Sequence, residues 1–386
     1  MTLLQRLADS SLLPKDFSQL LVTVSTTING VENPFGPEQI HYTRTLLRIL
    51  FVVLRGSAHS ANSDAVAKSA GDNSVAVTQL VLNILDRVVA QGFRSLAMLV
   101  HEPDSPTGPE DIALITAILQ ACLSISGTEQ CQTQILNIMA SNDILHVATS
   151  LFSWADKLAD KGDPVYGELA LLFLLELSAL PAVAEQLACD GLLGHITSAN
   201  LAGFMRRPNV TPFSDNAGAS RCYGIWAKGV LPILLNMLSA LGATVAPEVA
   251  FVLNQFPNLL RSSVERFEAP GISRTVSRDA PQYVTLLAVS EVHSLALLTR
   301  VLGALRMNNS RDIPEVGWDG GPLLENIEFW LSSRKVLRER TLPLGSREGD
   351  WRATKAADGS GCENMLEQKV VAQLEAVKDV LSEEME

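Results

Sequence analysis

Apolar residues recur every three to four positions along most of the chain, which is the spacing that one face of an α-helix requires. The segment 74–90 shows the pattern well. Its polar side chains are Gln79, Asn83, Asp86 and Arg87, and its apolar face is formed by Val77, Leu80, Val81, Ile84, Leu85 and Val88. A Gln91-Gly92 pair and a second apolar run follow. The pattern predicts two neighbouring helices joined by a very short turn.

The same spacing predicts further helices, and proline stands near the start of most of them. Their ranges are 37–54, 219–241, 247–264, 281–306 and 322–338. The run 21–28 contains enough Val, Thr and Ile to form a strand. We expect a helix there, because no neighbouring segment could pair with a strand. Four longer loops are expected at 59–72, 206–218, 268–280 and 307–321.

Two stretches, 112–147 and 168–196, resemble one another in the order of their features. Each has a long apolar helix that ends in a Leu-Ser pair, then a second helix, a short polar turn and a third helix. The turns are Ser141-Asn142-Asp143 and Cys189-Asp190-Gly191. Such units cannot bury their own apolar faces, whereas a stack of several can. The predicted fold class is therefore all-α, a right-handed α-solenoid of armadillo/HEAT-like helical repeats.

The end of the chain has a different pattern. Residues 345–361 are rich in Gly, Ser, Asp and Lys, which predicts a mobile loop. A narrow apolar stripe follows, formed by Leu366, Val370, Leu374, Val377 and Leu381. The predicted division is a solenoid over 1–340, a mobile loop over 341–362, and a C-terminal amphipathic helix over 363–386. This helix either caps the solenoid or docks onto another chain, and capping is favoured.

Composition agrees with helices and narrows the function classes. Apolar residues make up 47% of the chain, aromatic residues only 5%, and the net charge is −12. That charge opposes direct contact with nucleic acid or anionic membranes. The five cysteines are widely spaced, which favours reduced thiols, and no secretory signal is expected at the start of the chain. The uncharged run 229–247 is broken by Pro232 and Gly242, so a buried helix is favoured over a membrane span.

Motifs for catalysis or cofactor binding are missing from the sequence. It contains no phosphate-binding loop, nucleophile elbow or HExxH pair. Cys122 and Cys131 lie in apolar helices and are expected to pack in the core. The six histidines are scattered singly: His41, His59, His101, His146, His195 and His293. We expect no enzyme activity, no cofactor and no metal site.

Candidate partner contacts lie in the last quarter of the chain. Phe329 and Trp330 are adjacent, so on a helix their rings point about 100° apart and one ring could be exposed. Alternatively, both rings pack within the chain, one in the core and one at its edge. These two residues and the stripe at Leu366, Val370, Leu374, Val377 and Leu381 are the candidate partner-binding residues. Basic residues gather over 334–340, either as a solvated helix end or as a contact to an acidic partner.

One block goes beyond a generic helical repeat. Tyr223–Leu238 reads YGIWAKGVLPILLNML, and the block continues through Ala246–Val249 to Asn254–Leu260. It resembles the C-terminal region of the large inner-ring scaffold nucleoporins of the nuclear pore, of the fungal nucleoporin 188 type. The likeness extends more loosely over most of the chain.

The resemblance implies a solenoid without enzymatic activity in the nuclear pore complex at the nuclear envelope. It also implies binding to short helical segments of linker nucleoporins and support of nucleocytoplasmic transport, including protein and mRNA transport. A transport-receptor-like adaptor that binds Phe-Gly repeats, cargo or transport factors is the alternative. The family has no short functional motif, so the resemblance places no partner site on particular residues.

Overall fold

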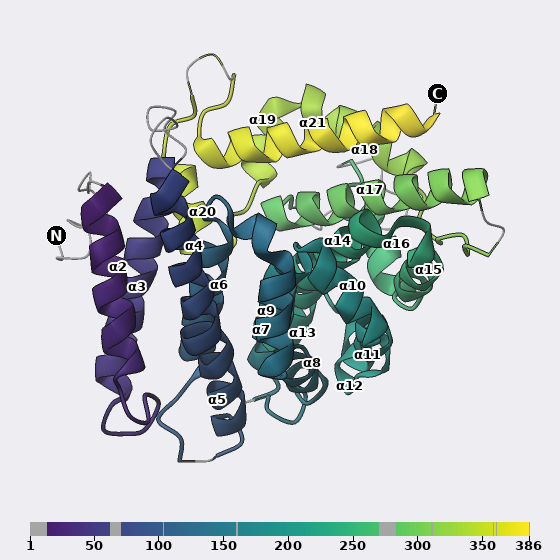
Figure 1. Ribbon diagram of the computed structural model, residues 1–386. Helices are drawn as coiled ribbons and strands as arrows, with labels where there is room; N and C mark the ends of the chain where they lie inside the picture. The colour runs from purple at the N-terminus through teal and green to yellow at the C-terminus, as the bar shows by residue number, and fades with distance from the viewer. Residues whose placement is uncertain are drawn as a thin grey trace. The chain divides into compact units, whose positions relative to one another are not determined.

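The computed structural model describes residues 14–61, 71–102, 104–159, 161–269, 283–309, 312–357, 359 and 361–385. Within these residues the regular secondary structure is helical, apart from two isolated β-bridges, Val284 with Thr341 and Lys355 with Asn364. The chain forms two compact units, Met1–Leu192 and Leu193–Glu386. Figure 1 shows the helices of each unit packed in layers against their neighbours. The all-α solenoid class predicted from periodicity is confirmed.

The described part of the first unit is a series of packed helices. In chain order they are α2 (Pro14–Asn29), α3 (Ile40–Ala61), α4 (Gly71–Ile84), the π-helical turn η1 (Leu85–Ala90), α5 (Gln91–Leu99), α6 (Pro109–Leu123), the short 3-10 helix η2 (Thr128–Cys131), α7 (Gln132–Ser141), α8 (Ile144–Ser153), α9 (Val165–Ser178) and α10 (Pro181–Cys189). Helices α2 and α3 lie side by side, as Figure 1 shows. Residues 21–28 therefore form helix, as expected, and not a strand.

Both predicted repeats fold as sets of three helices. The first consists of α6, α7 and α8, and the second of α9, α10 and α11 (Leu192–Ser198). The two turns before the third helices share a left-handed backbone conformation, with φ of 58° at Asp143 and 74° at Gly191. A left-handed residue satisfies the end of one helix and turns the chain into the next. The order of features in the sequence thus identified equivalent positions.

The expected turn at Gln91-Gly92 is wrong. The backbone stays right-handed helical from Ile84 through Gln91, so α4, η1 and α5 form one helical path. Gly92 has a packing role instead, because a Cβ atom there would lie 3.2 Å from Cδ1 of Ile115 and 3.6 Å from Phe35. The glycine lets α6 approach this helix closely. Its neighbour Phe93 is fully buried and stacks on Phe173 at 3.9 Å between ring centroids.

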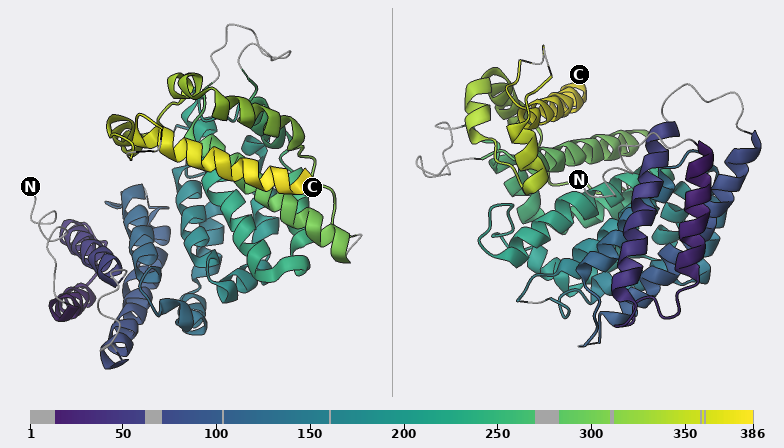
Figure 2. Two further views of the ribbon diagram at one scale, coloured as in Figure 1. Left: turned by 90° about the horizontal axis from the view of Figure 1, so that it is seen from above. Right: turned by 90° about the vertical axis from the view of Figure 1, so that its left-hand side faces the viewer.

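The second unit contains helices of very different lengths. After α11 come α12 (Asn200–Met205), α13 (Ala217–Gly224), the π-helical turn η3 (Ile225–Val230), α14 (Leu231–Leu241), the 3-10 turn η4 (Gly242–Thr244), α15 (Ala246–Asn254), α16 (Pro257–Glu265), α17 (Leu286–Asn309), α18 (Gly321–Ser332), α19 (Arg334–Arg340), α20 (Ser346–Ala353) and α21 (Met365–Met385). Helix α21 packs along α17 and α18, as both views of Figure 2 show.

One long helix crosses the second unit despite an internal proline. Residues Ala217–Thr244 form a single helical span, and Pro232 lies just after the π-helical turn η3. A proline inside an α-helix removes a hydrogen bond and clashes with the carbonyl four residues earlier, and a wider π turn relieves that conflict.

This span and Leu286–Asn308 are apolar and long enough to cross a membrane by length and composition alone. The most apolar stretch of Ala217–Thr244 is 61% buried inside the protein, and Trp226 and Met237 have no exposed surface. This burial is what the preferred interpretation of 229–247 as a core helix requires.

Two other predicted helices are broken in the structure. The range 247–264 divides between α15 and α16 at Phe256, because Pro257 begins a new helix and Phe256 turns into the core with no exposed surface. The range 322–338 divides between α18 and α19 at Ser333. Within 345–361 the chain forms α20, so this segment is partly helical. Residues 62–70 and 270–282, inside two expected loops, lie outside the described residues.

Candidate partner-binding surface

The predicted pair on α18 occupies two environments. Trp330 has no exposed surface, and its indole N–H donates a hydrogen bond to the backbone carbonyl oxygen of Phe267 at 2.8 Å. Phe329 is half-buried, and its ring meets that of Trp330 edge to face at 5.6 Å. The two rings thus point to different neighbours, as the helical spacing indicates. Only Phe329 of this pair keeps surface that a partner could contact.

The apolar stripe of α21 is covered by its own chain. Its five residues are between 0% and 3% exposed: Leu366, Val370, Leu374, Val377 and Leu381. They pack toward α17 and α18, so they form part of the interior of the second unit. A partner could reach this stripe only if α21 left its position. Partner binding by these residues stays a prediction, and the arrangement agrees with the preferred alternative in which α21 covers the helices before it.

Two of the four basic residues at 334–340 form ion pairs within the chain. Arg334 bonds Glu375 at 3.1 Å, and Arg338 bonds Glu367 at 2.9 Å and also contacts Glu363. The hydrogen bond to Glu367 raises the pKa of Arg338 above its usual value. These ion pairs tie α19 to α21. Their first role is therefore an internal contact, which the sequence pattern did not reveal because the partner carboxylates lie 25 to 41 residues further along the chain.

A buried polar cluster surrounds Glu291 on α17. The carboxylate accepts hydrogen bonds from the Tyr223 hydroxyl at 2.7 Å, the Trp226 indole N–H at 2.9 Å and the Arg266 guanidinium at 2.8 Å. Glu291 has no exposed surface, and burial raises its pKa despite these donors. Burial and the nearby carboxylate also raise the pKa of Tyr223. Both carboxylate oxygens are occupied, so the cluster fixes η3 against α17 and α16 and leaves no free acid or base.

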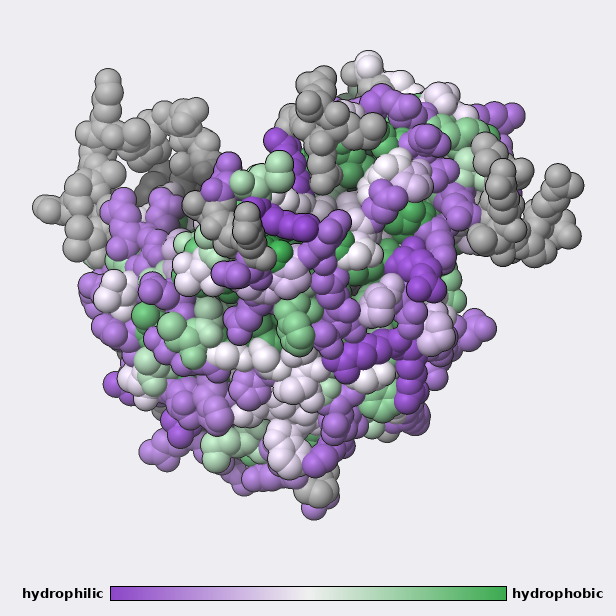
Figure 3. All heavy atoms as spheres, turned by 90° about the vertical axis from the view of Figure 1, so that its right-hand side faces the viewer, coloured by the Kyte–Doolittle hydropathy of each residue, from purple (hydrophilic) through white to green (hydrophobic). Residues whose placement is uncertain are grey.

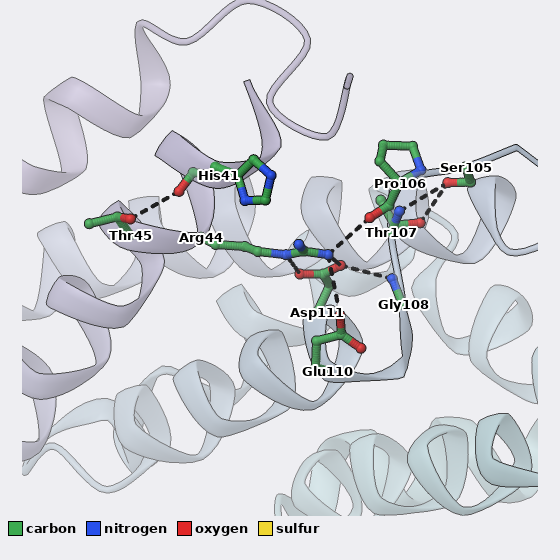
Figure 4. A network of polar contacts seen from close by, with 9 residues as sticks. All are labelled: His41, Arg44, Thr45, Ser105, Pro106, Thr107, Gly108, Glu110 and Asp111. Carbon is green, nitrogen blue, oxygen red and sulfur yellow. Dashed lines mark hydrogen bonds and ion pairs between the residues drawn. The ribbon is translucent and has the colours of Figure 1, made fainter. Parts of the chain in front are cut away.

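A second buried carboxylate lies in the first unit and is drawn in Figure 4. Asp111, at the start of α6, accepts two bonds from Arg44 of α3, each of 2.7 Å, and one from the backbone N–H of Gly108 at 2.9 Å. Arg44 also donates to the carbonyl oxygen of Pro106 at 3.0 Å. The bidentate pair joins α3 to the start of α6, where the helix dipole favours a negative charge. This arrangement is a helix cap and a tether.

Metal and thiol chemistry find little support in the described part of the chain. Within those residues, no group of three or more His, Cys, Asp or Glu side chains lies close enough to hold a metal ion. None of the five cysteines forms a disulfide. Cys122 is fully buried, as expected for core packing, and burial raises its pKa far above the usual value, whereas Cys131 is only partly buried. A thiol held protonated in this way is a weak nucleophile.

Comparison with known protein families identifies the family of this chain. The family described as "Nuclear pore protein NUP188 C-terminal domain" matches residues 20–381. The chain belongs to this family. The resemblance noted at Tyr223–Leu238 is thereby confirmed, and that block is now seen to hold Tyr223 and Trp226, the two residues on η3 and α13 that bond Glu291.

Individual members of the NUP188 family are similar over different shares of the chain. Nucleoporin NUP188 of Chaetomium thermophilum is 58% identical over 99% of this chain and 22% of that protein. Nucleoporin nup184 of Schizosaccharomyces pombe is 32% identical over 40% of the chain. A solved fragment of Nup188 from Myceliophthora thermophila has 68% sequence identity and a TM-score of 0.85, and the match covers 96% of this chain and all of that fragment.

Two conclusions follow from these similarities. The chain is a nuclear pore protein domain with the all-helical fold of the Nup188 fragment, and its location is the nuclear pore complex at the nuclear envelope. It spans about a fifth of the length of the Chaetomium protein it matches. The activities and partners of the whole nucleoporin are thus not carried over to this domain as findings.

Proposed function

We propose that this chain is a structural scaffold module of the inner ring of the nuclear pore complex. In that role it binds short helical segments of linker nucleoporins and supports nucleocytoplasmic transport. The observation that carries the proposal is the NUP188 family match over residues 20–381, together with a fold of stacked helices. Stacked helical repeats present grooves and long faces to partner segments, which is a common use of such folds.

The proposal includes the lack of an enzymatic role. Three buried carboxylates, those of Glu291, Asp111 and Glu367, each accept three hydrogen bonds from donors of their own chain. Catalytic acids and bases instead need an accessible group beside a substrate cavity. Membership in a family of nucleoporins supports the same conclusion.

Helix α17 offers the best surface for a partner helix. Its most apolar stretch is hydrophobic enough for a membrane span, yet only 44% of that stretch is buried. Leu297 is half-exposed, Val301 is 39% exposed and Ala304 is exposed. Spacings of four and three residues place these side chains on one face of the helix. An amphipathic partner helix needs such a stripe for its own apolar side chains.

The surroundings of this stripe are mixed in polarity. Figure 3 shows the side of the molecule where α15 and the end of α17 lie, with apolar islands between polar side chains. Phe251 on α15 is 53% exposed and Met307 on α17 is 89% exposed. Separated apolar anchors within a polar surround suit a reversible interface with a short segment. We include Phe329 of α18, the one predicted partner-binding residue with surface available, as a second anchor to be tested.

The test is binding of the chain to synthetic peptides that cover the helical segments of inner-ring linker nucleoporins, measured by isothermal titration calorimetry at low and high salt. We expect saturable binding with one peptide per chain that persists at high salt, because apolar contacts dominate. Val301→Glu should weaken the binding about tenfold or more, which corresponds to at least about 1.4 kcal/mol. Phe329→Ala tests the second anchor.

Val22→Glu provides the matched control. Val22 on α2 is 49% exposed, so the substitution adds the same charge to an exposed apolar position in the other unit. It should leave the affinity unchanged. Binding to none of the linker peptides would contradict the scaffold proposal, and exclusive binding to Phe-Gly peptides would favour the adaptor alternative. If V301E and V22E weakened peptide binding equally, α17 would not be the binding surface.

A further inference from the structure

A cavity of about 520 Å³ opens in the first unit, at the bottom of the helical pair α2 and α3. Three segments line it: the end of α2 with the loop that follows, the first half of α3, and the helical path through the π turn η1. This volume lies within the range of ligand pockets, which hold a small organic molecule or a few peptide residues. The π turn is a second feature of interest, since π bulges are frequent at functional sites.

The wall of this cavity contains a polar group without a partner. Thr43 of α3 lines the cavity and is only 1% exposed, and its hydroxyl oxygen makes no hydrogen bond with any residue that the structure describes. Nearly all buried hydroxyls in proteins are hydrogen-bonded, because an unsatisfied one carries a desolvation penalty. The oxygen is not itself accessible from the cavity, so a ligand with a polar group would remove that penalty once the Thr43 side chain rotated toward it. The position of Thr43 therefore favours an occupant that is not purely apolar.

The remaining lining offers both apolar and amide groups. Ile28, Leu47 and Val88 are buried side chains that form apolar wall. Asn29 and Asn83 face each other, with 3.4 Å from the Asn29 amide nitrogen to the Asn83 amide oxygen. A carboxamide carries both donors and acceptors, as a peptide group does, so the two groups pair well. The distance between the asparagines is long for a hydrogen bond, which leaves them available to a peptide backbone.

The charge of the lining is positive, in contrast to the chain as a whole. Among the described residues that line the cavity, Arg87 is the one that carries a charge, and the chain as a whole carries a net charge of −12. The Arg87 side chain is 57% exposed and lies 3.6 Å from the carboxylate of its neighbour Asp86, a loose contact between two adjacent residues. An anionic group at the mouth of the cavity would therefore meet an accessible guanidinium.

We propose that this cavity binds a short extended peptide segment of a partner protein, with an apolar side chain beside a carboxylate. The apolar side chain of the peptide packs against Leu47 and Val88, and the peptide carboxylate forms an ion pair with Arg87. The peptide backbone bonds the asparagine amides and, after rotation of the Thr43 side chain, its hydroxyl. The segment is extended because a helix uses its backbone groups internally and would offer none to these side chains. This site lies in the first unit and is separate from the α17 surface, and it does not depend on the scaffold role.

The probe is a capped tripeptide of sequence Asp-Leu-Asp, titrated into the full chain with methyl groups isotopically labelled. The methyl signals of Ile28, Leu47 and Val88 serve as reporters in two-dimensional NMR. We expect these signals to move in a saturable manner. The capped tripeptides Asp-Ser-Asp and Lys-Leu-Lys should each bind more weakly by about fivefold or more, because one lacks the apolar side chain and the other opposes Arg87.

Three variants locate the contacts. Thr43→Val keeps the shape of the side chain and removes the hydroxyl, and it should weaken Asp-Leu-Asp binding about fivefold, the value of one hydrogen bond. Arg87→Gln should weaken binding by a similar factor at low salt. The difference between this variant and the unaltered chain should become smaller at high salt, because salt screens the ion pair. Arg48→Gln is the control, because Arg48 is an exposed cation on α3 that does not line the cavity. It should bind the probe as the unaltered chain does.

Absence of saturable shifts at Ile28, Leu47 and Val88 would overturn the proposal. Equal binding of the acidic and basic tripeptides, or equal effects of R87Q and R48Q, would do the same. Unchanged methyl spectra of the free variants establish that each one is folded. The two proposals are tested separately. If the tripeptide does not bind the cavity, linker peptides can still bind at α17 in the calorimetry experiment. If linker peptides do not bind at α17, the tripeptide can still bind the cavity.

Discussion

The indole N–H of Trp226 lies 2.9 Å from the carboxylate of Glu291, and both side chains are completely buried. This contact joins a π-helical turn to a helix 65 residues later in the chain. It also places a charged group in the core of the second unit, where Arg266 supplies the compensating charge at 2.8 Å. Tertiary contacts of this kind hold the second unit together and underlie the predictions below.

Removal of the buried carboxylate should be strongly destabilising. Glu291→Ala leaves the Arg266 charge and two other donors without their acceptor, so the free energy of unfolding should fall by about 3–5 kcal/mol. Urea denaturation followed by tryptophan fluorescence measures this change. Glu315→Gln removes an exposed ion pair with Arg306 and serves as the control, with an expected loss of about 0–1 kcal/mol. Comparable losses for the two variants would show that the cluster contributes little to stability.

Substitution of glycine should have opposite effects at two helical positions. Gly92→Leu forces a large side chain into the contact with Ile115 and should lower the free energy of unfolding by about 1–3 kcal/mol. Gly194 in α11 is exposed, and nothing lies within 4 Å of a Cβ built there. Gly194→Ala should raise the free energy by about 0.5–1 kcal/mol through helix propensity. Thermal denaturation shows whether each variant is more or less stable than the unaltered chain. A G92L variant that is more stable would contradict the role of Gly92 in the close approach of α6.

The matched turns of the two repeats should respond in opposite directions to glycine and alanine. Asp143 has a φ of 58°, which costs a non-glycine residue about 1–2 kcal/mol, so Asp143→Gly should be neutral or stabilising. Gly191 has a φ of 74°, and Gly191→Ala should destabilise by about 1 kcal/mol. Chemical denaturation distinguishes the two. If D143G were the more harmful change, its side chain and not its backbone would govern that turn.

The adjacent aromatic residues of α18 should separate stability from binding. Trp330→Ala empties a buried site and removes the bond to the Phe267 carbonyl oxygen, so a loss of about 3–5 kcal/mol is expected. Phe329→Ala affects a half-buried ring and should cost clearly less. Differential scanning calorimetry ranks the two variants. The reverse order would mean that Phe329, and not Trp330, anchors α18.

Helical periodicity was a reliable guide wherever a local signal marked the end of an element. Pro109 begins α6 and Pro181 begins α10, and the polar turns ending at Asp143 and Gly191 separate the third helices of both repeats. These features act within a few residues through backbone conformation and hydrogen bonding, so they are visible in the sequence. The same local logic was misleading at Gly92, where a glycine that resembles a turn is required by the approach of another helix.

The candidate site was less accessible to sequence reasoning. The spacing of α21 correctly indicated an apolar face along Leu366–Leu381, but a stripe in a sequence does not say whether its own chain or a partner covers it. Likewise, the basic residues at 334–340 gave no sign that Glu363, Glu367 and Glu375 would pair with them. A strong signal was available only in the family resemblance of Tyr223–Leu238.

The sequence alone determined the all-helical class, the order of most helices and the family, because these depend on local spacing and on a long shared pattern. Tertiary structure decided which apolar faces are covered, where Glu291 finds its donors, and that Thr43 lines a cavity without a hydrogen-bond partner. The physical reason is that burial and pairing depend on side chains brought together from distant positions. Their free energies are properties of contacts that no short stretch of sequence contains.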